Sequence, residues 1–191
     1  MKFYLAGKVP KGNELDTYID FRVGYGETLA KSFPDLTILD PNGTTEQALL
    51  VGVTEEDPLY WFGHDCWMIK KSDVVIVQAD IKLGAGTAQE MLIAKYFNKP
   101  VITVLPKDTH HRRTNLMLAS GVVEDWIHPF VGSTSDLIVE KLEDSLPWLE
   151  AYNVNPDGQK IKTIEVIDEA ITYFEEFIAA ANVAIPAQRR L

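Results

Sequence analysis

DVVIVQADIKLGAGTAQEMLIAKYFNKPVITVL, residues 73–105, is the stretch that decides the fold. It begins with a run of apolar, mostly β-branched residues, 73–79, which is typical of a strand buried on both faces. A glycine-rich turn follows, and residues 87–97 then have the pattern of a helix. Residues 100–105 form a second apolar run. A strand, a helix and a strand in succession predict a right-handed crossover between parallel strands.

The rest of the chain extends this alternation of strands and helices. We therefore expect an α/β fold of the flavodoxin-like or Rossmann-like kind: a doubly wound, five-stranded parallel sheet in the order 2-1-3-4-5, with an added C-terminal helix. The predicted strands are residues 2–6, 36–40, 73–79, 100–105 and 126–131. The predicted helices are residues 14–33, 57–71, 87–97, 115–120, 133–146 and 162–182.

The length of 191 residues suits one such domain with an extension. We place the α/β domain at residues 1–147, and a linker with a C-terminal helical extension at residues 148–191. The linker itself is predicted at residues 148–160, which contain a Pro-Asp-Gly turn signal. In the helix that follows, apolar residues recur at spacings of three and four, and such a stripe must be buried. It can pack on its own sheet or on a second subunit, and we expect a homodimer or a higher homo-oligomer.

Composition excludes several classes of protein. The net charge of −10 argues against binding to a nucleic acid polymer, whose phosphates are held by Lys and Arg surfaces. No apolar run approaches the length of a membrane span, and the first residues resemble a strand, not a signal peptide. Cys66 is the single cysteine, so neither a disulfide framework nor a zinc site is expected. We expect a cytosolic protein with no membrane partner, no metal and no cofactor.

The glycine turn at residues 84–90 has two interpretations. Gly84 and Gly86 let a ligand approach the backbone closely, and amides at the start of a helix favour anions. In that case the amides would lower the pKa of Glu90 and keep it charged, as a nucleophile requires. Alternatively, Thr87 and Glu90 form a capping box, which only satisfies the helix terminus.

Four short blocks distributed along the chain favour the ligand-binding interpretation. Tyr4 lies in the first predicted strand, which ends in a small-residue turn at Gly7. Asp65 comes eight residues before the aspartate that opens the third strand, and Glu90 ends the glycine turn. Asn115 begins an Asn-Leu-Met stretch twenty-five residues after the glutamate. In order and spacing these blocks resemble the nucleoside 2-deoxyribosyltransferase family and the related 2′-deoxynucleoside 5′-phosphate N-hydrolases.

The resemblance implies an enzyme that cleaves the N-glycosidic bond of a small-molecule nucleoside or nucleotide and passes the sugar to another base or to water. By similarity, Glu90 would be the nucleophile at the anomeric carbon, and the Tyr4 hydroxyl would hold its carboxylate. Asp65 would hydrogen-bond the sugar hydroxyls, and Asn115 would contact the sugar, often across a subunit contact in this family. Further substrate contacts are expected from Gly7, Asn42, Gly84, Gly86 and Thr87.

Each assigned side chain also has a purely structural interpretation. Tyr4 can be an ordinary strand aromatic, and Asp65 an exposed helix residue. Asn115 can be a helix cap, and Asn42 a turn former. These alternatives stay open at the level of the sequence.

One departure from the family pattern leaves the reaction itself open. Transferases of this family usually carry an aspartate six residues before the nucleophile, where this chain has Gly84; the nearest acid upstream is Asp80. Transfer and hydrolysis therefore remain alternatives, as does a nucleotide-binding sensor without turnover. A third alternative is a nucleoside-monophosphate phosphoribohydrolase, in which Arg112 or Arg113 and the turn amides would bind a 5′-phosphate.

Overall fold

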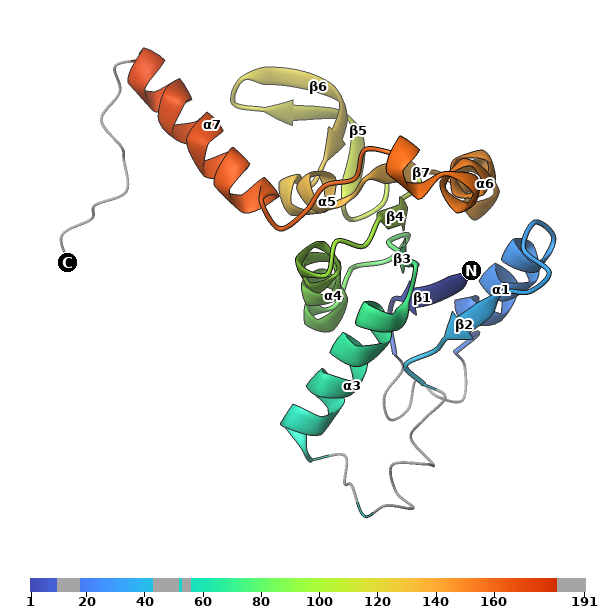
Figure 1. Ribbon diagram of the computed structural model, residues 1–191. Coiled ribbons are helices and arrows are strands. Elements are labelled where there is room, and N and C mark those ends of the chain that lie inside the picture. The colour runs from blue at the N-terminus through green and yellow to red at the C-terminus, as the bar shows by residue number, and fades with distance from the viewer. Residues whose placement is uncertain (10–17, 43–51, 53–55, 182–191) are drawn as a thin grey trace.

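The computed structural model describes residues 1–9, 18–42, 52 and 56–181 (Figure 1). Its centre is a five-stranded parallel sheet in the order β2-β1-β3-β4-β7. The predicted sheet and strand order are thus confirmed, in a flavodoxin-like arrangement. The strands are β1 (Lys2–Ala6), β2 (Thr37–Leu39), β3 (Val74–Gln78), β4 (Val101–Val104) and β7 (Leu137–Val139).

Helices cover both faces of this sheet. One core contains Tyr4 and Ala6 of β1 with side chains of α3 (Pro58–Lys71), α4 (Ala85–Tyr96) and α5 (Pro129–Thr134). The other contains Phe3 and Leu5 with side chains of α1 (Phe21–Ala30), the 3₁₀ helix η2 (Leu142–Ser145) and α6 (Leu146–Val154). Alternate residues of a strand point to opposite faces, so Tyr4 is directed towards α3 and α4.

An antiparallel hairpin lies between β4 and α5, where a short helix was predicted. It consists of β5 (Arg112–Leu118) and β6 (Gly121–Ile127). Gly121 has φ +118°, a conformation that suits glycine at this tight turn. The predicted helix 115–120 is therefore wrong. The predicted last strand at 126–131 is also wrong, because the fifth place in the sheet belongs to β7.

Other differences from the prediction follow from short or interrupted patterns. Residues 133–146 do not form one helix, because β7 occupies three of them and η2 another four. The linker predicted at 148–160 is wrong for 148–154, which belong to α6, with Leu149 fully buried in the second core. The 3₁₀ helix η3 (Pro156–Gly158) follows it. The boundary between the α/β domain and the C-terminal extension remains a prediction.

The first and last predicted helices are shorter than expected. Asp20 caps α1, and residues 14–17 of the predicted helix lie outside the described residues. The last helix, α7 (Val166–Ala181), leads away from the sheet (Figure 1). Within the part of the chain that the structure describes, no helix is both long enough and apolar enough to cross a membrane.

A buried ion pair joins α4 to the edge of the sheet. Lys95 of α4 is fully buried and its ammonium group contacts the Asp136 carboxylate, which is 1% exposed. The same carboxylate accepts hydrogen bonds from the backbone N–H groups of Val101, at 2.7 Å, and Lys162, at 2.6 Å. One carboxylate therefore fixes the helix that carries Glu90, strand β4 and the segment leading to α7.

Candidate active site

Tyr4 and Glu90 meet between the sheet and α4. The Tyr4 hydroxyl donates a 2.7 Å hydrogen bond to Oε1 of Glu90, and the tyrosine side chain is fully buried. Burial, followed by the charges of Glu90 and Asp65, raises the pKa of Tyr4, so the phenol stays protonated and keeps the proton that it donates to Glu90. The other oxygen of Glu90, Oε2, is buried and has no hydrogen-bond partner among the described residues.

The capping-box interpretation of Glu90 is wrong. Helix α4 begins at Ala85, with Gly84 as its N-cap, so Thr87 already lies inside the first turn. Within the described ranges no side chain caps this helix, and Thr87 is buried. Glu90 therefore lies in the second turn, beyond the unpaired amides at the helix start.

This position reverses the predicted effect on the acidity of Glu90. The pKa of Glu90 is raised to about 7, chiefly by burial and also by the negative charge of Asp65, against the opposing effects of the Tyr4 hydrogen bond and the charge of Arg22. The expected lowering of the pKa by helix amides is thus wrong, because loss of solvation outweighs every favourable contact. Near neutral pH the carboxyl group is divided between its charged and neutral forms.

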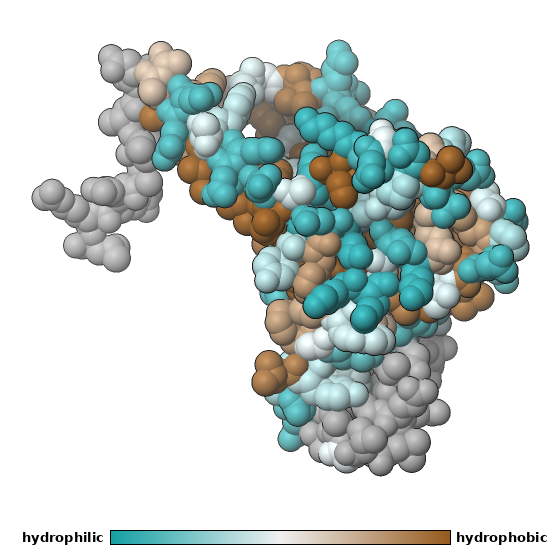
Figure 2. Space-filling view, in the orientation of Figure 1, coloured by the Kyte–Doolittle hydropathy of each residue, from teal (hydrophilic) through white to brown (hydrophobic). Residues whose placement is uncertain are grey.

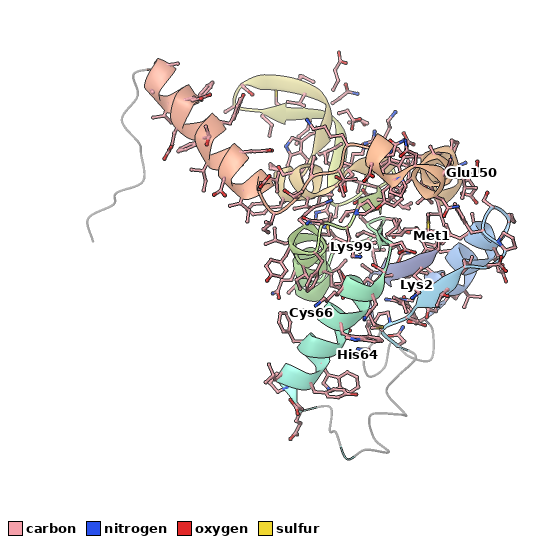
Figure 3. The ribbon with its side chains drawn as sticks, viewed as in Figure 1. Met1, Lys2, His64, Cys66, Lys99 and Glu150 are labelled. Atoms are coloured by element: carbon pink, nitrogen blue, oxygen red, sulfur yellow. The ribbon has the colours of Figure 1, made fainter. Side chains whose placement is uncertain are left out.

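Asp65 comes from α3 and lies within electrostatic reach of both residues. Its charge raises the pKa of Tyr4 and of Glu90, and its side chain is 34% exposed. Burial raises the pKa of Asp65 as well, while the hydrogen bond from His64 and the charge of Arg22 lower it. His64 holds the carboxylate at 3.0 Å from its Nδ1 atom. Figure 3 labels His64 and Cys66, which flank Asp65 on α3.

Arg22 is a component of the site that the sequence did not reveal. It is 3% exposed, and it donates from Nε to the carbonyl of Leu5, at 3.0 Å, and from Nη2 to that of Gly7, at 3.3 Å. Asp20 and Asp40 pair with it at 3.1 and 3.5 Å. Its positive charge lowers the pKa of Glu90, so it favours the ionised form. In the sequence Arg22 resembles an exposed helix residue. The local hint of its role was Asp20, two residues earlier, which caps the helix and pairs with Arg22.

The predicted binding glycines differ in how much space surrounds them for a larger side chain. An added Cβ on Gly7 would lie 2.6 Å from the ring of Phe21, so a larger residue there would force that ring to move. At Gly84 and Gly86 an added Cβ would meet no atom of the described residues within 4 Å, so their packing does not demand glycine in this turn. Asn42 donates through its side chain to Asp20, at 3.4 Å, which connects it to the Arg22 cluster.

Asn115 lies elsewhere, in the exposed hairpin. It is part of β5 and has φ +49°, so both the short helix and the helix-cap interpretation are wrong. No hydrogen bond between described residues joins it to Tyr4, Asp65 or Glu90. The hairpin is nevertheless connected to the glycine turn, because His111 accepts a 3.0 Å hydrogen bond from the backbone N–H of Leu83.

Arg112, a candidate phosphate ligand, already has partners. Its guanidinium group donates to both carboxylate oxygens of Asp125, at 2.8 and 2.7 Å. A third donor of the same group reaches the carbonyl of Leu105 at 3.0 Å. These contacts fix the base of the hairpin. A bidentate pair of this kind competes with any phosphate for the same donors.

Comparison with known proteins gives no match by sequence and several by structure. No protein-family model matches the chain, and no curated protein matches it. The chain is similar to the solved structure of a 2-deoxyribosyltransferase from the psychrotolerant bacterium Bacillus psychrosaccharolyticus. Identity is 19% over 85% of this chain and 98% of that one, with a TM-score of 0.47. A CMP N-glycosidase of Clostridium botulinum is also similar, with 16% identity over 80% of this chain and 99% of that one and a TM-score of 0.42.

Proposed function

We propose that the protein is an enzyme that cleaves the N-glycosidic bond of a nucleoside or nucleotide, with Glu90 as the nucleophile. The observation that carries the proposal is the buried hydrogen bond from Tyr4 to one oxygen of Glu90, which leaves the other carboxylate oxygen without a partner among the described residues. A purely structural glutamate on a helix gains nothing from this burial, which is costly for a charged group. A nucleophile, by contrast, benefits from a buried hydrogen bond that holds it in one orientation.

The proposed reaction has two displacement steps. Oε2 of Glu90 attacks the anomeric carbon while the bond from that carbon to the base breaks, and the bonding electrons leave with the base, which takes up a proton from solvent. Water or a second base then attacks the same carbon and releases a proton to solvent, and the carboxylate of Glu90 leaves. The transition state is oxocarbenium-like. The negative charges of Glu90 and Asp65, poorly solvated where they lie, would stabilise it.

Tyr4 and Arg22 would prepare Glu90 for the first step. The hydrogen bond from Tyr4 fixes the orientation of the carboxylate, and Arg22 favours its charged form without a direct hydrogen bond to it. Asp65 would bind sugar hydroxyl groups, and the open space beside Gly84 and Gly86 would admit the substrate. We propose that Gly7, Asn42 and Thr87 also contact the substrate, and that Asn115 contacts substrate bound at the Glu90 of a second subunit.

A panel assay tests the proposal. The protein is incubated with deoxynucleosides, ribonucleosides and their 5′-monophosphates, with and without a free acceptor base, and released base is measured by chromatography. We expect base release from at least one member, and the effect of the acceptor distinguishes transfer from hydrolysis. Failure of every member, while one of them raises the melting temperature, would favour the second candidate.

The second candidate function is a nucleotide-binding sensor without turnover. Gly84 favours it, since this exposed position lacks the acid that would protonate a leaving base. The same observation is compatible with an enzyme whose leaving group departs without that help. The panel assay therefore decides between the two candidates by whether free base is released, because both candidates would bind the ligand.

Activity should rise with pH through neutrality. Glu90 attacks only when ionised, and its pKa of about 7 means that the active fraction falls about tenfold for each pH unit well below that value. The measurement is kcat/KM against pH for the free enzyme. We expect an ascending limb with a midpoint near 7 rather than near the ordinary glutamate value.

Asp65→Asn provides the control for this assignment. It removes a negative charge that raises the pKa of Glu90, so the midpoint of the ascending limb should move to lower pH. The midpoint is informative even if the variant binds its substrate poorly. A midpoint that stays in place, or moves upward, would show that the limb does not report on Glu90.

A further inference from the structure

Helix α7 carries an apolar seam that its own domain leaves largely exposed. The side chains of Ile167, Ile171 and Phe174 are 42%, 50% and 49% exposed, and Ile178 continues the seam as a partly buried residue. Their spacings of four, three and four are those of alternating d and a positions in a heptad repeat. Figure 2 shows hydrophobic surface along α7 next to hydrophilic surface of the same helix.

The segment before α7 is anchored so that the helix leads away from the sheet. The Lys162 ammonium group donates to the carbonyls of Gly132, at 2.8 Å, and Ser135, at 2.7 Å, while its backbone N–H binds Asp136. These three bonds fix the point of departure. Because the anchor is already formed, pairing of α7 with another helix orders less chain than pairing of a free tail would.

We propose that α7 forms a parallel two-stranded coiled coil with α7 of a second copy of this chain. The seam is the kind of surface that a helix with the same repeat fits, with β-branched Ile171 and Ile178 at the a positions, as in parallel two-stranded coiled coils. The flanking positions are compatible with an identical partner. The e positions hold Asp168 and Glu175, whereas the g position between them holds Ala170.

The charges of α7 select the parallel orientation. In a parallel pair each g residue faces an e residue of the other helix, so Glu175 lies opposite Ala170 and no like charges meet. In an antiparallel pair e residues face each other, which would bring Asp168 and Glu175 together across the interface. A helix of this length is marginal alone, so the pairing should depend on protein concentration.

Sedimentation of the full chain over a range of concentrations tests the pairing. We expect a dimer for the wild type and a monomer for the double variant Ile171→Glu/Phe174→Glu. The matched control is Tyr173→Glu, which changes a residue that is 72% exposed and off the seam, and it should remain dimeric. A wild type that is monomeric at every concentration, or a seam variant that is still dimeric, would overturn the proposal.

Disulfide capture tests the orientation. In a Cys66→Ser background, Ile167→Cys should form a covalent dimer under mild oxidation, because in a parallel pair each d residue lies beside its own copy. Glu169→Cys, which points outward, should not form one. An antiparallel pair would place residue 167 far from its copy, so the absence of a covalent dimer for Ile167→Cys would contradict the parallel coiled coil.

Discussion

Replacing Glu90 by Gln should lower the rate of base release by about 10⁴-fold or more, the size of effect seen when a catalytic nucleophile is removed. The variant keeps an acceptor oxygen for the Tyr4 hydroxyl, which donates at 2.7 Å, so the local packing should survive. An amide also costs less to bury than a carboxylate. The melting temperature should therefore be unchanged or slightly higher while activity is lost.

This combination separates a catalytic role from a structural one. A residue that only supported the fold would lose stability and activity together. The measurement is base release alongside thermal unfolding of the same preparations. A Glu90→Gln variant that retains more than a tenth of wild-type activity would remove Glu90 from the mechanism.

Asp136→Ala should destabilise the fold by about 3–5 kcal/mol, since it leaves the buried Lys95 ammonium group without its partner. The backbone N–H groups of Val101 and Lys162 lose their acceptor as well. The matched control is Glu140→Ala, which breaks the surface pair between Glu140 and Lys107, with half-exposed side chains 3.4 Å apart. A surface pair of this kind contributes about 0–1 kcal/mol.

Urea unfolding of these variants measures both effects. In a double-mutant cycle, Lys95→Met should cost less in the Asp136→Ala background than in the wild type, because the buried charge is then already without its partner. Equal costs in the two backgrounds would show that the two side chains act independently. In that case the ion pair between Lys95 and Asp136 would not contribute to the free energy of unfolding.

The parallel sheet could be predicted because its inner strands carry an unambiguous signal. Strands β1, β3 and β4 are short apolar runs, rich in β-branched residues in β3 and β4, and each was placed within about two residues. The hairpin and β7 could not be placed in this way. β7 has three residues, and the alternation in β5 is weak because the hairpin packs little of either face.

The contact between Tyr4 and Glu90 could be expected from spaced motifs, whereas its electrostatics could not. The predicted start of α4 was only two residues too late, at 87 instead of 85. That error placed Glu90 beside unpaired amides, and the burial that raises its pKa to about 7 could not be seen in the sequence. Arg22 was missed for a related reason: its burial depends on carbonyls at the end of β1, which no local pattern reveals.

The anomeric configuration of the product tests the central claim most directly. Two successive displacements through Glu90 retain the configuration of the substrate, whereas a single attack by solvent inverts it. With a β-nucleoside as substrate and methanol added as acceptor, the configuration of the methyl glycoside can be determined by NMR. A β-glycoside is the result expected if Glu90 forms a covalent intermediate, and an α-glycoside would contradict it.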